Sequence, residues 1–176
     1  ISGEGDIGQG CTTMLTMIAA EELGIPPSDV SVSSADTDLT PYCHGAWASR
    51  VTMTAGNAVQ RAAADVKRQL LEGAAEMLET SVEDLYVQDG AVHMKGFPEK
   101  RLTVAEVCEE KQFARGGGGI LGRGTYQAPT EMADKKTIYG NISPAYTFVA
   151  QTAEVTVDTE TGQVDVIRLV AADDLG

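Results

Sequence analysis

A glutamine between two glycines, directly before a predicted helix, is the first feature of this 176-residue sequence with the chemistry of a binding site. Gly8 and Gly10 allow the backbone to approach a ligand closely, and Gln9 offers both a donor and an acceptor to a heterocycle. Backbone amides at a helix start also favour an anion. The same residues suit a glycine turn with a solvated glutamine, so residue types alone leave both interpretations open.

A second loop of small residues surrounds a single arginine. It runs from Gly45 to Arg50 and leads into a long predicted helix. The Arg50 guanidinium is suited to fork onto phosphate oxygens, and the Ser49 and Thr52 hydroxyls and the helix amides would add further bonds. The alternative is a helix-capping loop whose arginine is a surface cation. The pattern fits a phosphate or pterin site and such a loop equally well.

The spacing of Gly3, Gly5 and Gly8 also matches the GxGxxG pattern of dinucleotide-binding domains. Only two residues precede it where a hydrophobic strand is needed, and Glu4 and Asp6 stand where a pyrophosphate would lie. A Rossmann-type nucleotide-binding domain is therefore the less favoured alternative. The run Gly116–Gly119 is predicted to be a mobile loop without chemistry, because no strand precedes it and no helix clearly follows.

Composition narrows the class of protein. Hydrophobic residues make up 43% and charged residues 22% of the chain, which excludes a disordered or collagen-like chain, and no apolar run has the roughly 18 residues that a membrane span needs. Thirteen basic against 26 acidic side chains give a net charge of −13, which disfavours nucleic acid and anionic membranes as partners. The chain lacks an initiator Met and ends directly after a strand-like run, so we interpret it as a segment of something longer.

The three cysteines have no spacing typical of a metal site or a disulfide framework, so we expect reduced thiols and a cytoplasmic protein. Cys11, at a helix start, is predicted to be a packed thiol and not a reactive one. His44 is assigned to turn hydrogen bonding and His93 to a structural role in a hairpin.

The elements that must position these loops can be read from the apolar periodicity. Helices are predicted at 12–23, 54–79 and 103–110, the second with the most regular spacing and the third opened by a Thr103–Glu106 capping box. Strands are predicted at 30–34, 85–87, 91–94, 148–157 and 164–172. The class is therefore α+β, with a mixed or antiparallel sheet packed against one long and two shorter helices. We expect the long helix to lie on a sheet that includes 30–34 and the hairpin 148–172.

Four segments together carry a family resemblance: 2–24, 35–41, 45–59 and 139–158. In this order they resemble the molybdenum-cofactor-binding large subunit of the xanthine oxidase and aldehyde oxidase family, most closely that of 4-hydroxybenzoyl-CoA reductase. The resemblance extends through nearly the whole chain and is weakest from about 90 to 122. It favours the binding interpretation of both loops.

The resemblance implies specific site residues. It implies that Gly8, Gln9 and Gly10 bind the pyranopterin dithiolene. It implies that the second loop contacts the cofactor with its backbone near the metal and phosphate, at Ala48, Ser49, Arg50 and Val51. No side chain of this chain is expected to coordinate the metal, and no catalytic residue is assigned, because the family's catalytic glutamate is expected outside the chain.

The resemblance also implies a function. Residues 1–176 would be a central fragment of a molybdopterin-binding domain in a molybdenum-dependent oxidoreductase, which hydroxylates an aldehyde or N-heterocycle or reductively dehydroxylates an aromatic thioester. The cofactor would be molybdopterin in its cytosine dinucleotide form, carrying molybdenum in the parent enzyme and absent from the isolated fragment. Expected partners are the remainder of the large subunit, iron–sulfur and FAD subunits or domains, and a small-molecule substrate. The alternative is a non-catalytic assembly module.

Overall fold

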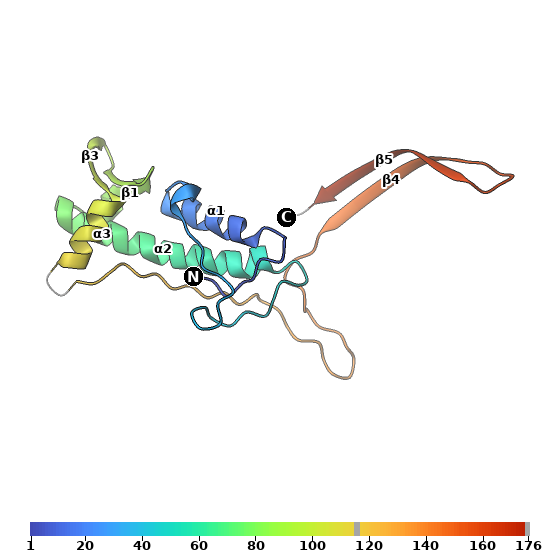
Figure 1. Cartoon of the computed structure of the whole chain (residues 1–176), viewed down its shortest axis with the longest axis horizontal. Coiled ribbons are helices and arrows are strands. Elements are labelled where there is room, and N and C mark those ends of the chain that lie inside the picture. The colour runs from blue at the N-terminus through green and yellow to red at the C-terminus, as the bar shows by residue number, and fades with distance from the viewer. Residues whose placement is uncertain (115–116, 175–176) are drawn as a thin grey trace. The chain divides into compact units, whose positions relative to one another are not determined.

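The computed structural model describes residues 1–114 and 117–174, which form two units, one up to Gln127 and one from Ala128 (Figure 1). The named strands pair only antiparallel, so the predicted α+β class with one long and two shorter helices is confirmed. In chain order the elements are α1 (Cys11–Leu23), η1 (Pro27–Asp29), α2 (Val51–Leu78), η2 (Val82–Asp84), β1 (Leu85–Gln88), β2 (Ala91–Met94), β3 (Phe97–Thr103), α3 (Val104–Phe113), β4 (Phe148–Val157) and β5 (Val164–Asp174).

The helix α2 is the centre of the first unit. Its N-terminal half packs on α1 in a cluster with Leu15 and Ala55, and its C-terminal half packs on β1, β2 and α3 in a cluster with Leu70 and Val92. Ala63, on the predicted apolar stripe, is only 5% exposed, so that face is indeed buried. Among the described residues, no helix combines the length and the apolarity that crossing a membrane requires.

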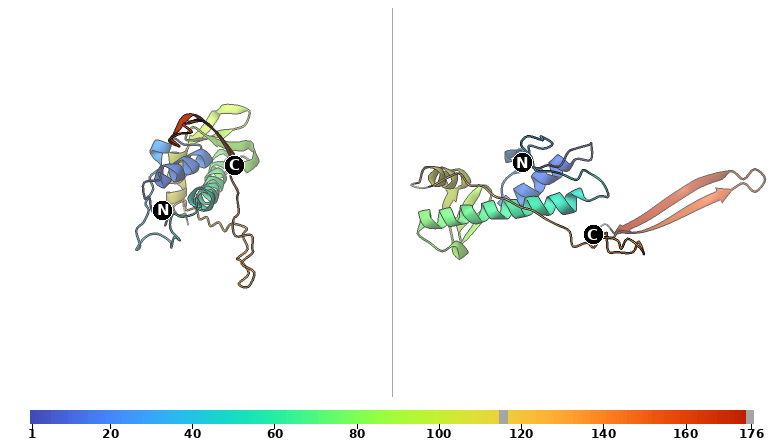
Figure 2. Two further views of the ribbon diagram at one scale, coloured as in Figure 1. Left: turned by 90° about the vertical axis from the view of Figure 1, so that its right-hand side faces the viewer. Right: turned by 90° about the horizontal axis from the view of Figure 1, so that it is seen from below.

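The helices α1 and α2 run in the same direction. Cys11 packs with Val51 at their starts, a Cβ added to Gly56 would lie 2.9 Å from Ile18 Cδ1, and Glu22 pairs with Lys67 farther along both helices. Two views agree on this side-by-side arrangement (Figure 1 and Figure 2). The N-termini of both helices therefore lie at the same end of the pair.

The three-stranded sheet β1–β2–β3 covers the other half of α2. Its first turn is Asp89–Gly90, with φ of 50° and 73°, as the sequence predicts for a tight hairpin. Thr103 and Glu106 form the predicted capping box of α3. Strand β3 was not predicted, because Pro98 and three charged residues mask its pattern.

The glycine-rich stretch after α3 lies along α2. A Cβ on Gly122 would lie 2.2 Å from the Ala62 carbonyl oxygen, and one on Gly124 would lie 2.0 Å from that of Ala58. These two glycines therefore serve close backbone packing. In the predicted mobile loop, Gly117–Gly119 has no regular secondary structure, and Gly116 lies outside the described residues.

The prediction of one sheet that includes 30–34 and the hairpin 148–172 is wrong. Residues 30–34 form no strand, and Ser34 makes only an isolated bridge to Ser2. The hairpin β4–β5 forms a two-stranded sheet of its own in the second unit, paired from Phe148–Asp174 to Val157–Val164 with one bulge. The 30–34 segment alternates only two valines with serines, which offers too little apolar surface to hold it in a sheet.

Candidate cofactor-binding site

The parallel packing of α1 and α2 brings the two loops singled out in the sequence to one place. The Gly8–Gly10 loop leads directly into Cys11, the second loop leads directly into Val51, and these two residues share one buried cluster, with Ala46 packed against it. The positive ends of two helix dipoles meet there, which makes the region attractive to an anion.

The first loop has already satisfied much of its helix start. Gly8 and Gly10 have φ of 101° and 77°, and nothing in the chain lies within 4 Å of where a Cβ would be, so within the chain itself glycine serves conformation there and not packing. The Asp6 carboxylate accepts hydrogen bonds from the amides of Gly8 at 2.9 Å, Thr12 at 3.2 Å and Gly10 at 3.4 Å. The bonds from Gly8 and Thr12 hold the pKa of Asp6 below its ordinary value of 3.8.

The Gln9 side chain is exposed and folds back on its own loop. Its oxygen accepts from the Ile7 amide at 2.7 Å, and its amide group donates to the Gly5 carbonyl at a long 3.4 Å. Because both contacts are solvent-exposed, a change of side-chain rotamer would turn Gln9 toward a ligand without disturbing the core.

The second loop leaves its helix start open. Ala48 and Ser49 both have left-handed φ, 51° and 53°, which is unfavourable for residues with a side chain. Their amides have no hydrogen-bond partner among the described residues. Arg50 stands at the N-cap of α2 without a side-chain cap, and the first turn of α2 contains no acidic residue. The amides of this first turn are therefore available to an external acceptor.

The Arg50 guanidinium forms a two-pronged contact with the carboxylate of Glu4. The guanidinium donates to the two carboxylate oxygens at 2.9 and 3.3 Å and also to the Gly45 carbonyl at 2.7 Å. The Cys43 thiol donates to the same carboxylate at 2.9 Å. Burial alone would lower the pKa of Arg50, but the hydrogen bonds and charge of Glu4 outweigh it and raise that pKa.

Glu4 is the residue of this region whose part in the site could not be predicted from the sequence. It is only 5% exposed, although it lies in a glycine-rich loop, where the sequence indicates only that its charge disfavours a pyrophosphate. Its partner Arg50 is 46 positions away, and no local pattern connects an acidic residue and a basic one over that distance. The contact comes from the parallel helix pair, which could not be read from the sequence.

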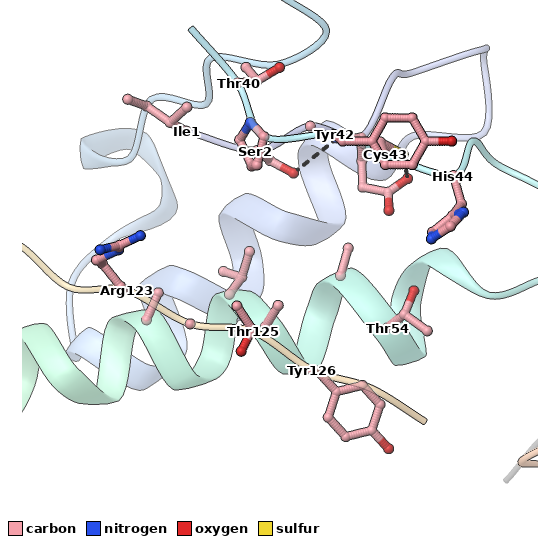
Figure 3. A pocket seen from close by; sticks show the side chains of 18 of the residues that line it. Ile1, Ser2, Thr40, Tyr42, Cys43, His44, Thr54, Arg123, Thr125 and Tyr126 are labelled. Atoms are coloured by element: carbon pink, nitrogen blue, oxygen red, sulfur yellow. Dashed lines mark hydrogen bonds between the residues drawn. The ribbon is translucent and has the colours of Figure 1, made fainter. Parts of the chain in front are cut away.

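A pocket of about 760 Å³ lies beside the Glu4–Arg50 pair. Figure 3 shows the N-terminal segment and residues 40–44 above α2, with residues 123–126 crossing that helix. The apolar stripe of α2 lines the pocket, and Tyr42, His44 and Tyr126 contribute polar side chains. Glu4 lines the pocket, and of the predicted cofactor-binding residues Arg50 alone does so.

The remaining candidates are two histidines and the cysteines. Cys11 is 3% exposed, and burial raises the pKa of its thiol, which confirms the packed-thiol interpretation. All three cysteines are free. His44 lies edge-on to Tyr42, its carbonyl accepts from Trp47, and His93 stacks on Tyr86. Within the described residues, no group of three or more His, Cys, Asp or Glu side chains is placed to hold a metal ion.

Known proteins match this chain over its whole length. Residues 1–176 match the family described as molybdopterin cofactor-binding domain. The probable hypoxanthine oxidase XdhD of Escherichia coli K12 is 33% identical over 99% of this chain and 17% of its own length. The carbon monoxide dehydrogenase large chain of Afipia carboxidovorans is 32% identical over 96% of this chain and 20% of its own length.

Solved structures agree with these relatives. The Cu,Mo-CO dehydrogenase superposes with a TM-score of 0.80 and 32% identity, over 99% of this chain and 21% of that one. Quinoline 2-oxidoreductase from Pseudomonas putida 86 superposes with a TM-score of 0.73 and 30% identity, over 98% of this chain and 21% of that one. The chain thus spans about a fifth of the length of these proteins.

The family match and the fold together exclude the Rossmann-type alternative. Among the described residues, Ser2 before the Gly3–Gly8 loop makes only an isolated parallel bridge to Ser34, and every named strand pairs antiparallel, so no parallel β–α–β unit is present there. The predicted family is confirmed by the match over residues 1–176 and by relatives more than 30% identical. The chain belongs to the molybdopterin cofactor-binding domain family, in the group that contains the xanthine and carbon monoxide dehydrogenases.

Proposed function

We propose that this chain is a central part of the large subunit of a molybdenum-dependent oxidoreductase and forms one wall of its molybdopterin site. The observation that carries the proposal is the parallel packing of α1 and α2, which places two helix starts and both predicted loops together. The chain as a whole has a net charge of −13 and repels anions at long range. A cofactor that carries phosphate therefore needs local donors, which this electropositive backbone region supplies.

The residues present fit such a group. The free amides of Ala48 and Ser49 and the first-turn amide of Val51 would hold phosphate oxygens. The exposed Gln9 amide would hydrogen-bond the pterin heterocycle, with Gly8 and Gly10 allowing close backbone approach. When bound, the molybdenum cofactor supplies the redox chemistry. This chain binds it and orients it.

The finer assignments rest on the family resemblance. We propose the cytosine dinucleotide form of molybdopterin, a catalytic glutamate outside this chain, iron–sulfur and FAD partner subunits or domains, and a cytoplasmic location. The parent enzyme would hydroxylate an aromatic N-heterocycle or an aldehyde, or reductively dehydroxylate an aromatic thioester. Relatives named for hypoxanthine and quinoline support the heterocycle first.

Two substitutions at one position test the site. In the full-length subunit with its partners, Ala48→Val should deplete bound molybdenum severalfold, because a β-branched side chain neither accepts a left-handed φ nor leaves room at the backbone. Ala48→Gly, the matched control, should retain the cofactor, since glycine adopts this φ freely. Molybdenum is measured by elemental analysis and the nucleotide after acid release.

These measurements also separate the rival function. A non-catalytic assembly module would carry no molybdenum in the full-length wild-type subunit, and that result would overturn the proposal. The isolated 176-residue chain, in contrast, is expected to contain none, because a partial cavity loses most of the burial that holds a ligand. Equal molybdenum in Ala48→Val and wild-type subunits would remove the second loop from the site.

A further inference from the structure

We propose that Glu4 is a positioning residue, which holds Arg50 and through it the Ala48–Ser49 turn in the conformation that receives the cofactor. This inference rests on the proposed function and assigns a role to a residue outside the predicted cofactor contacts. Its starting point is a buried carboxylate at the junction of two loops, 5% exposed in a chain whose other acidic side chains lie nearer the surface.

A buried carboxylate needs full compensation, and Glu4 receives it from side chains of the second loop region. Both of its oxygens accept from the Arg50 guanidinium, at 2.9 and 3.3 Å, and the Cys43 thiol adds a third bond at 2.9 Å. The Cys43 sulfur in turn accepts from the Gly45 amide at 3.1 Å. The carboxylate therefore ties the N-terminal segment to both ends of the loop that contains Ala48 and Ser49.

Arg50 closes that loop on itself. Its guanidinium donates to the Gly45 carbonyl at 2.7 Å, and its own carbonyl accepts from the amide and the hydroxyl of Thr54 in the first turn of α2. The loop is thus fixed at its first and last residues. Two of the four residues between them, Ala48 and Ser49, hold left-handed φ that neither would adopt freely.

The backbone on either side of Glu4 is itself fixed by contacts with other segments. A Cβ on Gly3 would lie 2.1 Å from the Pro41 carbonyl oxygen, so the N-terminal segment presses directly on the backbone that leads to Cys43. The Glu4 amide donates to the Ser2 hydroxyl, and the Ser2 amide donates to the Ser33 carbonyl. Glu4 therefore has little freedom to move, and neither has the guanidinium that it binds.

The test uses the full-length subunit in its complex, with the variant Glu4→Gln, which keeps the size of the side chain and removes the charge. We expect molybdenum to be lost about ten times faster from the variant than from the wild type under dialysis, the range for residues that support a ligand shell. The matched control is Glu22→Gln, which breaks an ion pair to Lys67 that also joins α1 to α2, and should lose molybdenum at the wild-type rate.

A second readout separates positioning from general stability. The melting temperature of each protein is measured with cofactor and after production in cells that make no molybdopterin. Positioning predicts that the temperature rise given by the cofactor is smaller in Glu4→Gln than in wild type. A merely structural role lowers both melting temperatures equally and leaves their difference unchanged, and that result would overturn the inference.

A double-variant cycle identifies the route of the effect. If Glu4 acts through Arg50, then Glu4→Gln combined with Arg50→Gln should lose molybdenum no faster than the more affected single variant. Additive effects would mean that Arg50 binds the cofactor independently, and would contradict the inference. Arg50→Lys, a milder change, should not restore the wild-type rate, because an ammonium group cannot fork onto Glu4 while it holds Gly45.

The outcomes distinguish this inference from the proposed function. A wild-type subunit without molybdopterin would refute the function itself. A wild-type subunit that holds molybdopterin, with Glu4→Gln unchanged in both loss rate and cofactor-induced temperature rise, would leave the function standing and refute only the role of Glu4.

Discussion

The loop before α1 and the loop before α2 end at neighbouring helix starts. Only the first loop has a side chain that accepts hydrogen bonds from the amides at its own helix start. In that loop the Asp6 carboxylate accepts hydrogen bonds from three backbone amides, and both left-handed positions are glycines, Gly8 and Gly10. Before α2 the amides of Ala48 and Ser49 have no acceptor in the described part of the chain, and these two residues hold the left-handed positions. The first loop is stable by local means, whereas the second is held in shape by contacts from elsewhere in the chain.

This difference has a physical cost and a use. A left-handed residue with a side chain costs about 1–2 kcal/mol, so the Ala48–Ser49 turn needs an external anchor. The Arg50–Glu4 pair provides it, at 2.9 Å and largely out of solvent. An open helix start that is held rigid is suited to bind a phosphate, because its donors are already oriented. Perturbing the anchor should therefore affect the second loop far more than any equal change in the first.

The largest effect is expected for Arg50→Ala. This change leaves the Glu4 carboxylate buried without its charged partner, and should lower the free energy of unfolding by about 3 kcal/mol, the low end for such pairs because the Arg50 side chain is 18% exposed. It should also deplete molybdenum more than Gln9→Ala, whose side chain makes only exposed contacts. Denaturant unfolding of the cofactor-free subunit and elemental analysis of the loaded one check both parts.

Two results would reverse the comparison. If Arg50→Ala has the same free energy of unfolding as wild type, then the buried Glu4 carboxylate is compensated equally well by other groups, and the second loop has no long-range anchor. A greater loss of molybdenum from Gln9→Ala than from Arg50→Ala would make the first loop the dominant part of the site.

An intermediate effect should distinguish two glycines that look alike in the sequence. Gly3→Ala places a Cβ 2.1 Å from the Pro41 carbonyl oxygen, and should cost about 2 kcal/mol because backbone must move. Gly10→Ala meets no atom within 4 Å and pays only for its φ of 77°, about 1 kcal/mol. Unfolding of the two variants by urea gives both values, and equal losses would contradict the distinction between close approach and conformation.

Much of the fold was predictable because its signals are local. The apolar stripe of α2 repeats every three or four residues, and the Thr103–Glu106 capping box and the Asp89–Gly90 turn each lie within a few residues. The two loops were found for the same reason, since small residues beside a helix start are visible in a short window. Features that join distant segments were not visible in this way.

Three such features show what local patterns omit. The partner of Arg50 could not be chosen among many acidic residues, so residue type left open whether its guanidinium forks onto phosphate or is a surface cation. Strand β3 pairs with β2 although its own sequence contains Pro98 and charged residues. The segment 30–34 has a strand-like alternation but pairs with no strand. In each case, tertiary contact decides, and the propensity of the segment does not.

The smallest effect concerns the self-capped loop and disappears in acid. The amides of Gly8 and Thr12 hold the pKa of Asp6 below 3.8, so the ionised carboxylate favours the folded state. This contribution is complete above the pKa of the unfolded chain and is lost as the pH falls through the lower folded pKa.

Asp6→Asn removes the titrating group, so its melting temperature should lie below that of wild type at pH 6 and approach it as the pH falls toward 2. Melting of the cofactor-free subunit across this range gives the two profiles. Asp29→Asn is the matched control, because among the described residues that carboxylate accepts from the Ser28 hydroxyl and from no backbone amide, and its profile should run parallel to that of wild type. A constant offset for Asp6→Asn at every pH would show that Asp6 supports the α1 start through geometry alone. The contrast between the two loops would then no longer rest on charge.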